Sequence, residues 1–173
     1  MKKYLILQVA LVVFSVALFS PARADLTPAR DLTGTWDTPF PVPVVVTIDD
    51  GFGNISVSQA KMNVRWRIKA RGNKAAIRSA RVGAIRSFRI LNDGGGDRAT
   101  IALLAKTALN NLSVNTIFKG KVSSSRLKVS TLGGKPVGTF RFTSDLLGGT
   151  YDYRPTSDTR YQIKRLRMVR KRR

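Results

Sequence analysis

The chain has 173 residues and a formal net charge of +21 at pH 7, and it contains no His, no Cys and no Glu. Those absences exclude His-dependent catalytic triads, thiol nucleophiles and zinc sites built on His or Cys. The length suits a single domain that can bury a core of its own. We therefore expect a protein that is not an enzyme and that carries no cofactor or metal.

Residues 1–24 have the features of a secretory signal peptide. Lys2 and Lys3 form a short positive segment, a mostly apolar stretch follows, and Ala22-Arg23-Ala24 supplies a small-x-small cleavage pattern. The sequence therefore predicts an exported protein, periplasmic or extracellular, whose mature chain spans residues 25–173 as one domain.

The mature chain is mainly β in character, with β-branched and aromatic runs separated by Gly, Pro, Asn, Asp and Ser. A first strand carries Trp36. Further strands are expected over residues 41–48, 54–57, 62–71, 114–122, 126–132, 137–142, 150–153 and 160–169. Many short strands at this spacing indicate an antiparallel β-barrel or a sandwich.

Two segments in the middle of the chain are ambiguous. Apolar residues over 75–91 fit a helical face and a strand face, but Gly83 weakens a helix by about 1 kcal/mol relative to Ala, so we favour two strands. Residues 98–112 have apolar side chains at helical spacing, and Asp97 can serve as N-cap. We predict one helix near 98–110, with a strand as the alternative.

The segment MNVRWRIKAR, residues 62–71, alternates strictly between apolar and polar residues. A period of two places alternate side chains on opposite faces of a strand, so one face suits a core and the other is nearly all cationic. Residues 61–92 hold ten bases and no acid, so no acid nearby in sequence balances this face. Like charges side by side destabilise a sheet, which favours an anionic partner. The candidate binding residues here are Arg65, Arg67, Lys69 and Arg71.

The C-terminal strand and tail form a second cationic region, because residues 159–173 hold eight bases and no acid. Arginine binds phosphate and sulfate with two parallel hydrogen bonds, which suits a polybasic clamp, whereas a solvated terminus is the simpler alternative. The candidate residues are Arg165, Arg167, Arg170, Lys171, Arg172 and Arg173.

Gly34-Thr35-Trp36 lies about ten residues into the expected mature chain, on its first strand. This G-x-W motif behind a signal peptide resembles the lipocalin-like (calycin) β-barrels. The resemblance implies that Trp36 closes one end of the barrel beside Gly34, and that a basic residue such as Arg160 stacks on it by cation–π attraction. It implies a structural role for these residues.

Together these features predict an exported, strongly basic binding module on an antiparallel barrel. Its partner would be an anionic polymer or membrane surface, such as lipopolysaccharide, acidic polysaccharide or anionic lipid. Nucleic acid is less favoured, because most aromatic residues fall at positions that look inward and base recognition needs exposed ones. The alternative is a lipocalin-like carrier of a small apolar ligand inside the barrel.

Overall fold

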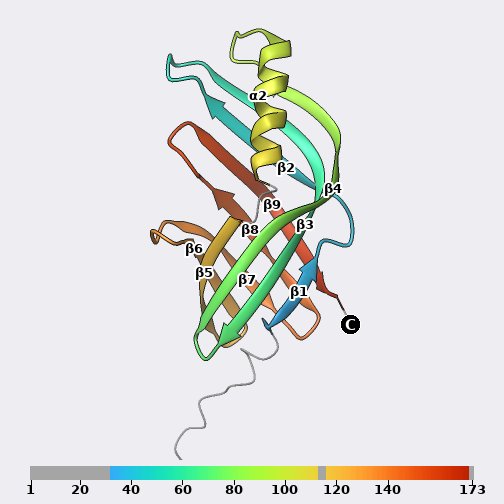
Figure 1. Cartoon of the computed structure of the whole chain (residues 1–173), viewed down its shortest axis with the longest axis vertical. Coiled ribbons are helices and arrows are strands. Elements are labelled where there is room, and N and C mark those ends of the chain that lie inside the picture. Colours follow the sequence, from blue (N-terminus) through green and yellow to red (C-terminus); the bar gives the residue numbers. More distant parts are fainter. Residues whose placement is uncertain (1–31, 113–115, 172–173) are drawn as a thin grey trace, which may run out of the picture.

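The computed structural model describes residues 32–112 and 116–171 (Figure 1). The strands are β1 (Gly34–Asp37), β2 (Val42–Asp49), β3 (Ile55–Arg71), β4 (Lys74–Asn92), β5 (Thr116–Ser123), β6 (Arg126–Thr131), β7 (Pro136–Phe142), β8 (Leu146–Tyr153) and β9 (Thr159–Arg170). The helix in the described ranges is α2 (Arg98–Asn111). Within those ranges, no helix has the length and apolar character needed to cross a membrane.

The strands form one antiparallel sheet that closes on itself. Their order is β1-β3-β2-β9-β8-β7-β6-β5-β4, and β4 also pairs with β3. Both β1 and β2 lie between β3 and β9, because β1 pairs with residues 65–68 of β3 and β2 with residues 55–62. The two short strands therefore share one position in a closed eight-stranded barrel. The prediction of an antiparallel β-barrel is confirmed, and the sandwich is excluded.

The alternation predicted for residues 62–71 is present in β3. The even-numbered residues from Met62 to Ile68 are buried in the core, and the odd-numbered residues between them lie on the outer face. The segments 54–57 and 62–71, expected as two strands, are parts of this one continuous strand. Buried and outward residues alternate without interruption over most of β3, so one face of that part of the strand stays in the core.

The prediction of two strands over 75–91 is wrong, because β4 runs unbroken from Lys74 to Asn92. Its pairing with β3 shifts register at three places, and Gly83 (φ 73°) and Ser87 (φ 50°) adopt positive φ angles. Such bulges insert an extra residue and turn later side chains to the other face. Ile85 and Phe88 can therefore both pack against the core at a spacing of three, which imitates a helix in sequence.

The predicted helix is confirmed as α2, which lies over one end of the barrel beside β2, β3 and β4 (Figure 1). Asp97 caps it by accepting a hydrogen bond from the Thr100 backbone N–H at 2.8 Å, and this bond lowers the pKa of Asp97. Its buried residues are Ile101, Ala105 and Leu109, and the Tyr161 hydroxyl donates to the Ala108 carbonyl at 2.8 Å. The helix thus covers that end of the core.

Aromatic side chains fill the barrel interior. Trp66 and Phe140 meet edge to face with ring centroids 4.8 Å apart, and Phe118 meets Tyr153 in the same way at 5.1 Å. Burial raises the pKa of Tyr151 well above its usual value, so this phenol stays neutral. The hollow left beside Trp66 and Tyr151 has a volume of about 10 Å³, which is room for one water molecule at most.

The G-x-W motif closes the barrel at the start of β1. Trp36 is fully buried, and its indole N–H donates to the Leu32 carbonyl at 2.9 Å. The guanidinium of Arg170 lies 5.6 Å from the centre of the Trp36 ring, because the two residues are paired between β1 and β9. A Cβ on Gly34 would lie 3.1 Å from Arg170 Nε, so glycine gives the arginine room to cross the indole.

The stacking cation is therefore Arg170, and the assignment of Arg160 to this role is wrong. Arg160 lies at the other end of β9, opposite Thr47 of β2. Its guanidinium donates to both carboxylate oxygens of Asp152, with Nε 2.8 Å from Oδ1. The sequence left both arginines available for the stack, and only the register between β1 and β9 distinguishes them.

The Arg160–Asp152 pair makes stability depend on pH in the acid range. The hydrogen bonds from Arg160 are the main reason that the pKa of Asp152 lies below 3.8 in the folded protein. A lowered pKa stabilises the fold above that pH, and this contribution is lost as the pH falls below 3.8. We expect Asp152→Asn to lower the melting temperature at pH 7 but not at about pH 2. Thermal denaturation at both pH values measures this, and a difference that persists unchanged in acid contradicts it.

Candidate functional site

The cations predicted on residues 62–71 do lie together on the outer face of β3, but one of them is neutralised. Arg65 Nε and Nη2 donate to the two carboxylate oxygens of Asp37, each at 2.7 Å. Asp37 is directly opposite Arg65 in the pairing of β1 with β3, and the bidentate contact raises the pKa of Arg65. The expectation that no acid accompanies this face is therefore wrong at Arg65. Arg67, Lys69 and Arg71 are exposed and, in the described structure, form no ion pair.

The most regular charge arrangement runs across the strands instead of along β3. Arg71 is paired with Lys74 on β4, Lys74 with Lys121 on β5, and Lys121 with Lys128 on β6. All four side chains are exposed on the outer face. Neighbouring strands lie about 4.8 Å apart, so the four cations form a line with one positive charge per strand. We call these four residues the transverse row.

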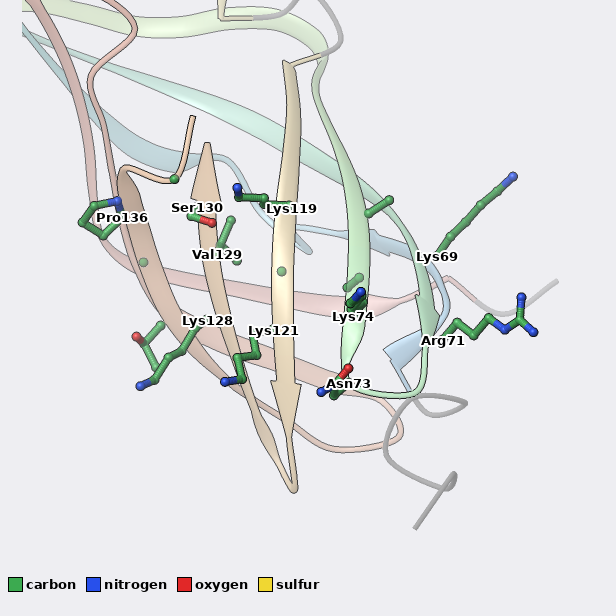
Figure 2. A pocket seen from close by; sticks show the side chains of 16 residues that line it. Lys69, Arg71, Asn73, Lys74, Lys119, Lys121, Lys128, Val129, Ser130 and Pro136 are labelled. Carbon is green, nitrogen blue, oxygen red and sulfur yellow. The ribbon is translucent and has the colours of Figure 1, made fainter. Parts of the chain in front are cut away.

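A second line lies two residues further along each strand, about 7 Å away. Its in-register members are Lys69, Ala76, Lys119 and Ser130. The two lines flank a groove of about 950 Å³, and Gly120 and Val129 contribute to its lining. Figure 2 shows Lys74, Lys121 and Lys128 on neighbouring strands, while the side chains of Lys69 and Arg71 on β3 extend away from them. The groove therefore has positive charge on both of its sides.

The transverse row continues toward β9 through a step along β6. Arg126 lies two residues before Lys128 on the same face and is paired with Arg141 on β7. Arg141 is paired with Gly148 on β8, and Gly148 with Arg167 on β9. We call the resulting set the cationic band, which comprises Arg71, Lys74, Lys121, Lys128, Arg126, Arg141 and Arg167. In the part of the chain that the structure describes, none of these residues forms an ion pair.

The band connects the two basic regions that the sequence singled out separately. Of the predicted tail residues, Arg165 and Arg167 are exposed on β9, and Lys171 is exposed just after it. Arg170 is engaged with Trp36 and with the carbonyl of Thr33, so it belongs to the barrel closure. Arg172 and Arg173 lie outside the described residues, as does the predicted signal peptide, residues 1–24.

Sequence reasoning missed six basic residues on this surface, namely Lys74, Lys119, Lys121, Arg126, Lys128 and Arg141. The signal was present in Lys119-Gly120-Lys121 and Arg126-Leu127-Lys128, where cations alternate with residues that face inward. These two segments flank a serine turn, and a hairpin places their outward residues on the same face. The pairing of Lys121 with Lys128 could have been inferred from this hairpin.

Four acidic residues lie at the β2–β3 turn and in the loop before α2. Figure 1 shows this turn and the start of α2 at the end of the barrel opposite the β3–β4 turn. Asp49 ends β2 and Asp50 begins the β2–β3 turn, in which hydrogen bonds from Asn54 and Phe52 lower the pKa of Asp50. The loop from Asp93 to Asp97 packs next to this turn and leads into α2. These four acids lie away from the cationic band, so they do not neutralise its positive charge.

The chain matches no protein-family model, no curated protein and no solved structure in comparisons with each of these sets.

Proposed function

We propose that the protein is an exported, non-enzymatic binding module that holds a polyanion on its cationic band. The band itself carries this proposal. Like charges paired across strands destabilise a sheet. The transverse row nevertheless places a cation on each of four consecutive strands, with each cation paired to the next. An anionic ligand removes that repulsion and gains from a single-sign field.

The class of polyanion follows from the surroundings of the groove. Its lining residues include no aromatic side chain, whereas proteins that bind single-stranded nucleic acid stack bases on aromatic rings. The signal-like segment 1–24 would bring the protein to an envelope or extracellular space. An anionic envelope polymer or a lipid headgroup therefore fits better than nucleic acid.

We also propose that the barrel is of the lipocalin-like kind. Its closed antiparallel sheet and the contact of Trp36 with Arg170, near the end of the last strand, support this. One difference from lipocalin-like barrels is the place of the helix, which in that family follows the last barrel strand and here, as α2, lies between β4 and β5.

Binding to heparin tests the proposed function. Residues 25–173 are applied to a heparin column and to a plain cation exchanger, and each is eluted with a salt gradient. Because the cations are arranged in lines, we expect clearly higher eluting salt on heparin. Equal elution from both columns means that the charge acts diffusely, and it removes the support for a binding surface.

The alternative function, a carrier of a small apolar ligand, makes a separate prediction. The hollow beside Tyr151 has only about 10 Å³, so we expect no saturable binding of a fluorescent fatty acid in titrations at high salt. High salt suppresses binding of the probe's carboxylate to surface cations. Saturable, salt-independent binding would contradict this and would require α2 or the aromatic core to move aside.

A further inference from the structure

The cations that surround the groove define a direction on the barrel surface. Along β3 the run of unpaired cations is interrupted at Arg65, which Asp37 neutralises, and the uncharged Asn63 then separates it from Lys61 on the same face. Across the strands, positive charge continues from Arg71 over β4 and β5 to Lys128 without a carboxylate partner in the described residues. The favourable path for an anion therefore lies perpendicular to the strands.

We infer that the ligand is a linear polyanion whose chain crosses β3 to β6 in the groove between the transverse row and the line of Lys69 and Lys119. This inference rests on the proposed function and adds the shape and the orientation of the ligand. The transverse row presents one charge about every 4.8 Å, so it suits a polymer with closely spaced anionic groups. Four strands give three such spacings, a length of about 14 Å.

The side chains around the groove suit a polymer that is recognised by its charge and not by bases or by a particular sequence. Lysines predominate, and their flexible stems carry compact charges that adapt to an irregular chain. Their methylene stems also cover the surface between the charges. Lys119 Nζ already donates to the Leu132 carbonyl at 2.9 Å, so its position beside the groove is fixed in part.

A membrane surface fits this site less well. Membrane-docking surfaces combine cations with exposed large apolar side chains on the same face. Phe52 is 92% exposed and Leu103 67% exposed, but they lie on the β2–β3 turn and on α2, away from the groove (Figure 1). Beside the groove, Leu132 is 65% exposed and Ile117 45% exposed, which are fewer and less exposed apolar side chains than a docking face for a bilayer uses. The cations instead line a groove on the side of the barrel. A chain can enter a groove that a flat bilayer would only bridge.

A length series of inorganic polyphosphate tests this inference. Affinity is measured by calorimetry at fixed ionic strength for orthophosphate and for chains of increasing length. We expect no measurable binding of orthophosphate, a steep rise in affinity until the chain spans about 14 Å, and only a shallow rise beyond that. Affinity that scales simply with total phosphate, with no length at which it levels, overturns the inference.

Two double variants test the direction of the chain. Lys121→Gln with Lys128→Gln removes two members of the transverse row, and Arg67→Gln with Arg78→Gln removes a matched pair of exposed cations on β3 and β4 outside the groove lining. Only the first should lower the log–log salt slope for polyphosphate, by about 1.4 to 1.8 units. Equal losses from both overturn the inference.

The remaining outcomes separate this inference from the proposed function. Binding is also measured to vesicles of phosphatidylcholine with phosphatidylglycerol. If the protein binds these vesicles more tightly than polyphosphate, and the Lys121/Lys128 variant loses that binding, the partner is a membrane and the inference of a linear ligand is overturned. Retention on heparin without any length dependence likewise overturns it, while the proposed function stands. A protein that binds neither heparin nor polyphosphate removes both.

Discussion

Replacing Lys74, Lys121 and Lys128 together with Gln is expected to lower the affinity for heparin about 100-fold at 0.15 M salt. Each cation that contacts the polymer releases bound counterions, so the log–log salt slope should also fall by about two to three units. The three side chains are exposed and form no ion pair in the described structure. Their loss should therefore leave the fold intact, and removing the repulsion between paired lysines should raise the melting temperature slightly. Titrations at several salt concentrations measure both quantities.

A control with the same change in net charge separates arrangement from amount of charge. Lys61, Arg86 and Arg154 are also exposed, lie outside the cationic band and form no ion pair among the residues described. Replacing these three with Gln should reduce heparin affinity much less, because only long-range attraction is lost. If the two triple variants weaken binding equally, net charge and not the band determines it.

Replacing Trp36 with Ala is expected to have the largest effect on stability, a loss of about 3–5 kcal/mol in the free energy of unfolding. The indole is fully buried at the point where β1 closes the barrel between β3 and β9. The substitution leaves a cavity, frees the Leu32 carbonyl and removes the ring beneath Arg170. Urea denaturation followed by circular dichroism measures the change.

Arg160→Ala provides the matching control for the closure. Arg160 and Asp152 are both partly exposed, so the loss of their ion pair should cost less than about 1 kcal/mol. Trp36→Phe keeps part of the buried area, so its loss of stability should lie between those of Trp36→Ala and Arg160→Ala. This variant can be measured even if Trp36→Ala does not fold. A Trp36→Ala variant as stable as Arg160→Ala would show that the stack contributes little to closure.

The period of two was enough to predict most of the fold. It identified the buried face of β3, and the turn residues bounded most of the other strands correctly. It failed in β4, where bulges near Gly83 and Ser87 change the face on which later residues lie. Bulges depend on how two strands meet, so a single strand read alone gives no reliable sign of them.

Predicting the site was harder, because it depends on register between strands. The exposed cations of β3 were apparent from one segment of sequence, but the neutralisation of Arg65 by Asp37 required the pairing of β1 with β3. Similarly, the transverse row consists of residues up to 57 positions apart, from Arg71 to Lys128, and only the barrel places them in a line. Charge composition alone led to the proposed class of partner, whereas the arrangement of the cations is visible only in the fold.

The separation of acids near α2 from the cationic band has a kinetic consequence. The acids offset part of the positive charge near α2, so unbalanced positive charge is densest around the cationic band, and the field of a polyanion turns the molecule before contact. The band then arrives facing the polymer, and more of the encounters are productive. Association should be fast and should slow steeply as salt is added, while α2 and the β2–β3 turn remain directed away from the bound polymer.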